Sequence, residues 1–288
     1  MVGGAEVAER ALMRSSVLAW LTVLGLASAS CTPEADQPSR EPGSDHTQAA
    51  TSPYVPEPGT TWQWQLSGKI DTSVDVTVYD VDLFETSDEV LTELRDGGRK
   101  IVCYFSAGSY EPGRPDSADF PKSVRGKELD GWPGERWLDV RDDAVREIMT
   151  ARLDLAKKRG CDGVEPDNVD GFENDSGFDL SSDDQVDYNR FLAEEAHARG
   201  LSVGLKNDIG QLEELVDDFD WALNEECFTY EECGAYEATF IAGGKAVFHA
   251  EYVEEDRLEE VCDKTRPLGL STLIKRLDLD AWYAACPE

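Results

Sequence analysis

Eight short apolar segments, rich in β-branched and aromatic residues, alternate with longer segments of helical pattern across residues 61–288. Continuous apolar runs of this length are typical of parallel strands buried on both faces. The alternation indicates an α/β fold with crossover helices, and eight such units favour a (β/α)8 TIM barrel over an open sheet. The segments expected as strands are 62–66, 76–79, 100–105, 163–166, 202–205, 221–223, 246–249 and 269–274.

Helix signals fill the gaps between these strands. Residues 142–159 carry apolar side chains at helical spacing, and Gly160 is expected to end that helix. A helix over 182–199 begins with a serine N-cap and ends before Gly200. No GxGxxG or P-loop motif follows a strand, which counts against a nucleotide-binding fold. Shorter helices are expected over 213–218 and 256–264.

The N-terminus is typical of an exported protein. Arg10 and Arg14 precede an apolar run over 17–27 that is too short to span a bilayer, and small residues follow it. Residues 1–30 are therefore assigned to a signal peptide. Ordinary cleavage after Ala29 would give a secreted soluble protein. A lipobox ending at Cys31, with Ser28 where leucine is usual, would give a cell-surface lipoprotein.

The cysteine count favours the lipoprotein. Six of the seven cysteines remain when Cys31 is set aside, an even number that suits disulfides in an oxidising compartment. An unpaired, exposed Cys31 would be reactive, whereas a lipidated one would not. Six cysteines allow fifteen connectivities. Of these, proximity in the chain and in the expected sheet favours the pairs Cys227–Cys233, Cys262–Cys286 and Cys103–Cys161.

Composition separates a linker from one folded domain. Residues 31–60 hold six of the thirteen prolines among Ser, Thr, Gln, Asp and Glu, and such a segment is expected to be an extended tether. Residues 61–288 then form the single barrel domain, expected as a monomer without a cofactor. The net charge of −33 disfavours nucleic acid and anionic lipids as partners. The membrane is thus expected to be contacted only through the N-terminal lipid.

Carboxylates gather where the expected strands end, which is where (β/α)8 barrels place their active sites. Glu165 and Asp167 share one face of their strand because side chains alternate with period two. Glu225 follows the expected strand 221–223, which is two strands after 163–166. Carboxylates on nearby strands can reach the spacing that glycosidases need. The residues expected to contact substrate are Trp64, Asp80, Asp82, Tyr104, Glu165, Asp170, Lys206, Asn207, Glu226, Glu251 and Tyr252.

Competing chemistries have weaker support. The sequence has no HExxH motif, paired CxxC or histidine cluster, so no zinc site is predicted. The segment 106–109 lacks a GxSxG elbow and a histidine partner, which disfavours a serine hydrolase. Hard cations take carboxylate ligands. A Mg²⁺ or Ca²⁺ site built from Glu165, Asp167 and Asp170 therefore stays open as an alternative.

These segments together resemble glycoside hydrolase family 114, the endo-α-1,4-polygalactosaminidases, over nearly all of residues 61–252. The resemblance implies a (β/α)8 barrel that hydrolyses galactosamine-rich polymers, with Asp167 and Glu225 as catalytic residues. Glu226 departs from the family pattern, in which Gln is expected at this position. The matching motifs include Trp62-Gln63-Trp64-Gln65-Leu66, Val102-Cys103-Tyr104-Phe105-Ser106-Ala107-Gly108, Gly163-Val164-Glu165-Pro166-Asp167-Asn168-Val169-Asp170 and Asn224-Glu225-Glu226-Cys227.

Two functions follow from the sequence as hypotheses. In the first, Asp167 is nucleophile or base and Glu225 is the general acid of a glycosidase, acting on a polysaccharide made cationic by loss of acetyl groups. In the second, the barrel is a non-catalytic glycan-binding lipoprotein. Release of reducing ends from a deacetylated polymer distinguishes the two.

Overall fold

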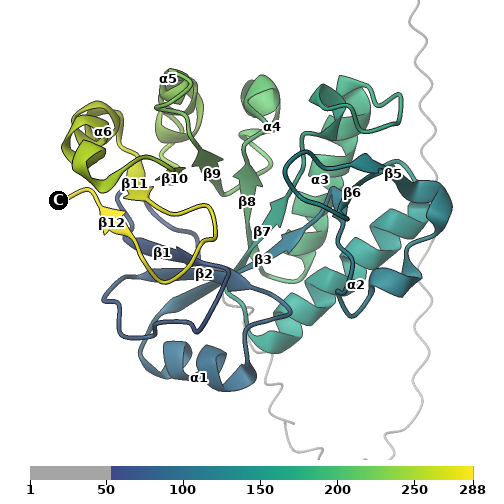
Figure 1. Ribbon diagram of the computed structural model, residues 1–288, viewed down its shortest axis with the longest axis horizontal. Coiled ribbons are helices and arrows are strands. Elements are labelled where there is room, and N and C mark those ends of the chain that lie inside the picture. Colours follow the sequence, from purple (N-terminus) through teal and green to yellow (C-terminus); the bar gives the residue numbers. More distant parts are fainter. Residues whose placement is uncertain (1–52, 288) are drawn as a thin grey trace, which may run out of the picture. The chain divides into compact units, whose positions relative to one another are not determined.

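In the computed structural model, which describes residues 53–287, eight parallel strands form one curled sheet (Figure 1). Each of the eight segments expected as a strand forms one, so that prediction is confirmed. Their order in the sheet follows the chain. The strands are β1 (Trp62–Gln65), β2 (Val78–Asp82), β3 (Lys100–Ser106), β7 (Gly163–Asp167), β8 (Ser202–Lys206), β9 (Trp221–Glu225), β10 (Val247–Glu251) and β11 (Ser271–Ile274).

The helices lie outside this sheet, in the arrangement of a single (β/α)8 domain (Figure 1). Asp142 caps the crossover helix over 143–159 at its start, and Gly160 ends it in the left-handed conformation at φ 78°. Ser181 and Asp184 form a capping box at the next one, so the N-cap lies one residue before the expected Ser182. The helices are α1 (Asp88–Asp96), α2 (Asp143–Arg159), α3 (Ser182–Ala198), α4 (Leu212–Leu215), α5 (Cys233–Tyr236) and α6 (Leu258–Thr265).

Side chains, rather than a backbone ladder, connect the first and last parallel strands. Among residues 53–287, no strand pairing joins β11 to β1. The indole of Trp62 instead donates to the carbonyl of Ser271 (2.9 Å) and stacks on Phe248 with ring centroids 4.6 Å apart. A short antiparallel strand, β12 (Ala284–Ala285), pairs with β11. The barrel is therefore closed by aromatic packing along one seam.

Two apolar layers fix the strands. The larger lies between the sheet and the helices, and contains Tyr79, Ile101 and Val164. The smaller fills the barrel interior, and contains Val78, Val102 and Phe248. Because faces alternate along a strand, Asp80 follows Val78 on the inner face, one layer nearer the carboxyl ends. The inward-facing side chains are therefore apolar near the amino ends of the strands and polar near the carboxyl ends.

An inserted antiparallel sheet was not expected from the sequence. It consists of β4 (Ser109–Tyr110), β5 (Arg125–Glu128) and β6 (Arg136–Leu138), in the order β4-β6-β5. The insertion follows β3 directly and places the segment around Glu135 near the carboxyl ends of the barrel strands.

Three disulfides connect Cys103 with Cys161, Cys227 with Cys233, and Cys262 with Cys286, the pairing that the sequence analysis favours. The signal peptide, Cys31 and most of the linker lie outside the described residues. The last linker residues contact the domain, since the Tyr54 ring lies 5.0 Å from the Lys100 ammonium. Within residues 53–287, no helix is long and apolar enough to cross a membrane.

Candidate active site

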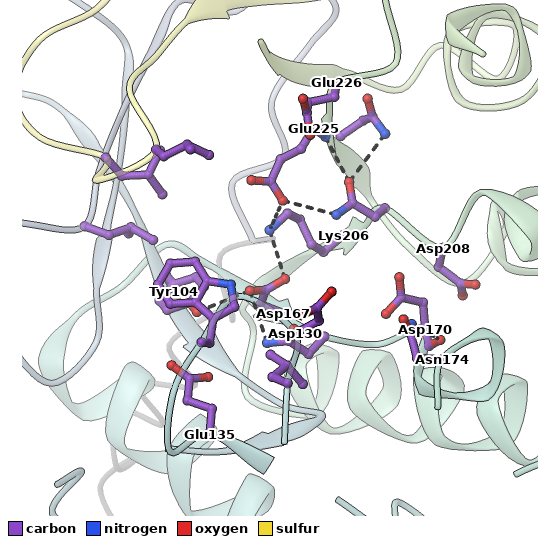
Figure 2. Close-up of a pocket in the computed structure, with 18 of the residues that line it drawn as sticks. Tyr104, Asp130, Glu135, Asp167, Asp170, Asn174, Lys206, Asp208, Glu225 and Glu226 are labelled. Carbon is purple, nitrogen blue, oxygen red and sulfur yellow. Dashed lines mark hydrogen bonds and ion pairs between the residues drawn. The ribbon is translucent and has the colours of Figure 1, made fainter. Parts of the chain in front are cut away.

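A pocket of about 1060 Å³ opens at the carboxyl ends of the barrel strands. Its lining includes residues from β1, β2, β3, β7, β8 and β9 and from the inserted sheet. Fourteen of the lining side chains are acidic and three are basic. Several of the carboxylates that the sequence places at strand ends therefore face one common cavity, including Asp167, Asp170, Glu225 and Glu226 (Figure 2).

Lys206, at the end of β8, is the centre of this pocket. Its ammonium lies 2.9 Å from Asp167 and 3.1 Å from Glu225 (Figure 2). It also lies 3.3 Å from the buried Glu165. Burial alone would lower the pKa of Lys206. The charges of its three carboxylate partners outweigh burial and hold the pKa well above its usual value. Lys206 is therefore a fixed cation between the two residues expected to be catalytic.

Asp167 ends β7 and is held on several sides. Tyr104 donates its hydroxyl to Asp167 Oδ2 (3.2 Å), and the Asn168 amide lies 3.3 Å from the same oxygen. The carbonyl of Asp167 accepts from the backbone of Ala107 (2.8 Å). Gly108 permits this approach, because a Cβ there would lie 1.7 Å from the Asn168 carbonyl oxygen. The loop after β3 thus fixes Asp167 through its backbone.

Glu225 ends β9 and faces Asp167 across Lys206. The Asn207 amide donates to Glu225 Oε2 (3.2 Å), and the Tyr252 hydroxyl donates to Oε1. Asn207 also accepts from the backbone N–H of Glu225 (2.9 Å). Asn207 and Glu226 both adopt positive φ, of 49° and 63°. Such conformations are costly for non-glycine residues and gather at functional sites.

Two of the expected substrate contacts lie beneath the pocket instead. Asp80 and Glu165 are fully buried in the barrel interior and do not line the cavity. Trp64 lies next to them, donating its indole N–H to Glu165 (3.1 Å). Glu165 and Trp64 contact Lys206, while Tyr104, Asn207 and Tyr252 contact the carboxylates of Asp167 and Glu225.

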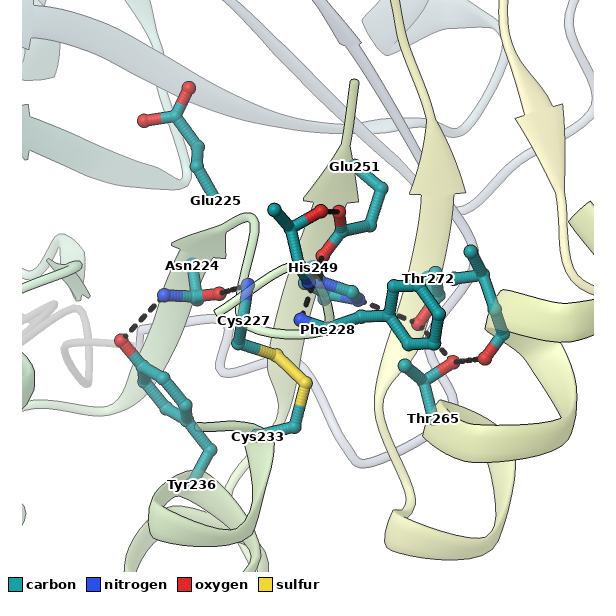
Figure 3. Close-up of a disulfide and its surroundings, with 12 residues drawn as sticks. Asn224, Glu225, Cys227, Phe228, Cys233, Tyr236, His249, Glu251, Thr265 and Thr272 are labelled. Carbon is teal, nitrogen blue, oxygen red and sulfur yellow. Dashed lines mark hydrogen bonds and ion pairs between the residues drawn. A yellow bond between two sulfur atoms is a disulfide. The ribbon is translucent and has the colours of Figure 1, made fainter. Parts of the chain in front are cut away.

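Glu251 also lies away from the pocket, because period-two alternation turns Tyr252 inward and Glu251 outward. It accepts from His249 (2.9 Å) and from Phe228 and Thr229, and so fastens the loop that follows Glu225 (Figure 3). Burial would raise the pKa of Glu251, but these hydrogen bonds hold it below its usual value. The Cys227–Cys233 disulfide closes the same loop.

Asp82 lines the pocket but is already paired. Arg114 binds it through two hydrogen bonds of 3.0 and 2.7 Å, and also contacts Glu111 (2.6 Å). The Asp82 carboxylate accepts two further backbone hydrogen bonds, from Phe84 and Glu85. Its role here is to hold Arg114 at the pocket wall.

Sequence reasoning missed several pocket residues. Glu135 lies in the loop between β5 and β6, directly before β6. Burial, followed by the charge of Glu111, raises the pKa of Glu135 to about 7. Trp132 and Tyr230 are more than half exposed and line the cavity, so their rings are available to sugars. No spacing rule identified them, because they lie on irregular loops.

Asp170 and Asp208 lie together on the other side of Lys206 (Figure 2). Burial, then the charge of Asp167, raises the pKa of Asp170 to about 6. Burial, then the charge of Asp170, raises the pKa of Asp208 to about 9. This part of the pocket has more carboxyl groups than cations, and a positively charged ligand would relieve their repulsion.

The carboxylates of the alternative cation site do not converge on a common point. Within residues 53–287, three or more ligand atoms of His, Cys, Asp or Glu lie within 4.8 Å of one another in one group, Cys227, Cys233 and His249. Both sulfurs of that group are joined in a disulfide. Glu165 and Asp167 instead contact Lys206.

Comparison with known proteins agrees with this geometry. The model of glycoside-hydrolase family GH114 matches residues 43–288. The structure of Ega3 from Aspergillus fumigatus, solved in complex with galactosamine, is 43% identical, with a TM-score of 0.78 over 82% of this chain and 98% of that one. The glycoside hydrolase domain of PelA from Pseudomonas aeruginosa shares the fold at 15% identity, with a TM-score of 0.63 over 79% and 99%. No curated protein sequence matches the chain.

Proposed function

The chain belongs to glycoside-hydrolase family GH114 and is a glycosidase, and we propose that it cleaves internal α-1,4 linkages in an extracellular, galactosamine-rich polysaccharide. One observation carries the proposal: Lys206 holds Asp167 and Glu225 on facing sides of one acidic pocket. The galactosamine bound by Ega3 supports the sugar class.

In the proposed reaction, Asp167 attacks the anomeric carbon and Glu225 protonates the departing oxygen. Attack is assigned to Asp167, whose carboxylate is held by Lys206 (2.9 Å) and Tyr104 (3.2 Å). When Asp167 becomes an ester it loses its charge. Glu225, which contacts the Lys206 ammonium, then removes a proton from the attacking water.

The spacing of the two carboxyl groups supports retention of configuration. Both accept from one nitrogen, so their accepting oxygens are no more than about 6 Å apart, nearer the ~5–5.5 Å of retaining than the ~6.5–9.5 Å of inverting glycosidases. We expect the α-anomer to be released first from deacetylated polygalactosamine. Proton NMR during the first turnovers checks this, and initial release of the β-anomer would contradict Asp167 as nucleophile.

The polymer assay also separates catalysis from binding alone. Reducing ends should appear across a broad range of chain lengths, since an endo-acting enzyme cuts internal linkages. Tight binding to the polymer without product would instead favour the glycan-binding function.

The substrate is proposed to be cationic, because each deacetylated galactosamine carries an ammonium. Arg114, Lys127 and Lys206, the basic residues of the pocket, are each paired with a carboxylate, which leaves a net negative cavity. Such a cavity raises the local concentration of a polycation. Salt screens exposed charges beyond about 10 Å at ~0.1 M. We therefore expect kcat/KM on the deacetylated polymer to fall as salt is added.

The fully acetylated polymer is the control for this effect. Its turnover should be slower and should change little with salt. A rate on the cationic polymer that does not respond to salt would show that the acidity of the pocket has no part in capturing substrate.

We further propose that the protein is exported and anchored through a lipid on Cys31, with the proline-rich segment holding the barrel away from the membrane. Cys31→Ser should move the protein from the membrane fraction to the soluble fraction without changing the activity of the domain. Unchanged partition between the two fractions would contradict the anchor.

A further inference from the structure

A second pair of carboxyl groups lies below the catalytic pair. Asp80 on β2 and Glu165 on β7 flank β3, and both are 0% exposed. The two side chains are close enough for each to shift the pKa of the other. No Lys, Arg or other donor in the described chain bonds to either oxygen of Asp80. With no other donor available to Asp80, the two carboxyl groups can share a hydrogen bond only if one of them holds a proton.

The charges nearby show why a proton is held there. Lys206 is the cation that contacts Glu165, Asp167 and Glu225, and within residues 53–287 none of these three has a second salt bridge. With Asp80 ionised as well, four carboxylates would share one ammonium, and two of the four, Asp80 and Glu165, are fully buried. Isolated buried charges of this kind are costly, and such groups take up a proton instead.

The hydrogen bonds around the pair indicate which member holds the proton. Glu165 receives the indole N–H of Trp64 (3.1 Å) and lies 3.3 Å from the Lys206 ammonium, and both contacts favour its anionic form. Asp80 has neither. Burial and the charge of Glu165 raise the pKa of Asp80 well above its usual value, whereas that of Glu165 rises to about 7.

We propose that Asp80 is a protonated positioning residue, which donates a hydrogen bond to Glu165 and thereby fixes the Lys206 ammonium between Asp167 and Glu225. The ammonium also lies 5.0 Å from the Trp64 ring. Lys206 thus contacts Glu165 and Trp64 on one side and donates to Asp167 and Glu225 on the other. Two further ionisable groups lie beside these residues. Tyr104 from β3 contacts Asp167, and Tyr252 after β10 contacts Glu225.

The state of the proton is tested without substrate. Infrared spectra of the protein labelled with ¹³C at the aspartate carboxyl should show the carbonyl stretch of a protonated acid at neutral pH, and Asp80→Asn should remove part of it. Asp208→Asn is the control, because burial also keeps Asp208 protonated at this pH and its loss should remove a separate part. If Asp80→Asn removes no such signal, Asp80 is ionised and the proposal is wrong.

The positioning role is tested by a pair of variants. Asp80→Ala removes the donor, and kcat should fall by about ten- to a hundredfold with KM little changed, because misplaced catalytic groups have losses of this order. Asp80→Asn keeps a donor at the same place and should restore most of kcat. Equal losses in both variants, or no loss in Asp80→Ala, would overturn the role. The infrared result stands even if the polymer proves not to be a substrate.

Discussion

Asp167→Asn and Glu225→Gln should each abolish turnover of the polymer, with kcat falling at least about 10³-fold for either variant. Each substitution keeps the size of the side chain and removes its charge. Asn cannot attack the anomeric carbon, and Gln cannot transfer the proton to the departing oxygen. Rates of reducing-end release at saturating polymer measure the loss.

The two variants should respond differently to the leaving group. In an aryl glycoside of a short galactosamine oligomer, the aryl oxide is a good leaving group and needs little protonation. Glu225→Gln should therefore recover much of its rate in the first turnover on this substrate, whereas Asp167→Asn should not. Recovery by Asp167→Asn alone would reverse the two roles.

Glu226→Gln is the matched control for these losses. Glu226 lines the same pocket and is adjacent to Glu225, but it makes no salt bridge to Lys206. The substitution also introduces the residue that the family resemblance leads us to expect. Its effect on kcat should stay within about tenfold. Near-wild-type turnover in either catalytic variant would remove the basis for the proposed mechanism.

Lys206→Met should lower both stability and activity. The substitution keeps most of the volume of the side chain but leaves Glu165, Asp167 and Glu225 without their cation. Loss of one partner from a buried ion pair costs about 3–5 kcal/mol. For a domain of this size that corresponds to a fall in Tm of roughly 10 °C, which thermal unfolding followed by circular dichroism would measure.

The destabilisation should depend on pH in a defined direction. The pKa of Glu165 is raised to about 7 even with Lys206 present, and removing the cation raises it further. At pH 5 the Glu165 carboxyl is largely protonated, so the variant should be closest to wild type there. The difference in Tm should then grow as the pH rises through 7.

Lys275→Met provides the comparison. Lys275 is also buried, but its ammonium contacts the Gln63 side chain and the carbonyls of Asp280 and Trp282 rather than carboxylates. Burial lowers the pKa of Lys275 to about 8. Its replacement should therefore destabilise the domain by an amount that stays nearly constant between pH 5 and 7. The same pH response in both variants would show that carboxylate repulsion is not the cause.

The sequence predicts the barrel well because its strands are continuous apolar runs, and such runs are visible without knowledge of tertiary contacts. The ends of the strands are less visible. β2 runs to Asp82 and β10 to Glu251, although the apolar pattern stops earlier. The interior of this barrel is polar near its carboxyl ends, so hydrophobicity alone ends these strands too soon. The inserted sheet has short, mostly polar strands that carry no periodic pattern.

The sequence also predicts that carboxylates gather at one rim, but not which of them meet the cavity. Asp80 and Glu165 lie too deep in the barrel, and Glu251 lies on the outward face beside His249. Depth depends on the tilt and stagger of the strands, which residue spacing along one strand does not contain. The pairing of Asp82 with Arg114 likewise joins segments 32 residues apart.

The seam between β1 and β11 has a consequence for how this protein is made. Trp62 and Ser271, whose contact closes the barrel, are separated by 209 residues. When the chain emerges from the ribosome or from an export channel, Trp62 emerges long before Ser271. The interior, with its buried Lys206 and carboxyl groups, therefore stays accessible to water until the C-terminal strands arrive. The Cys262–Cys286 bond then fastens the segment after β11 to α6, so the barrel is complete only once these late segments are in place.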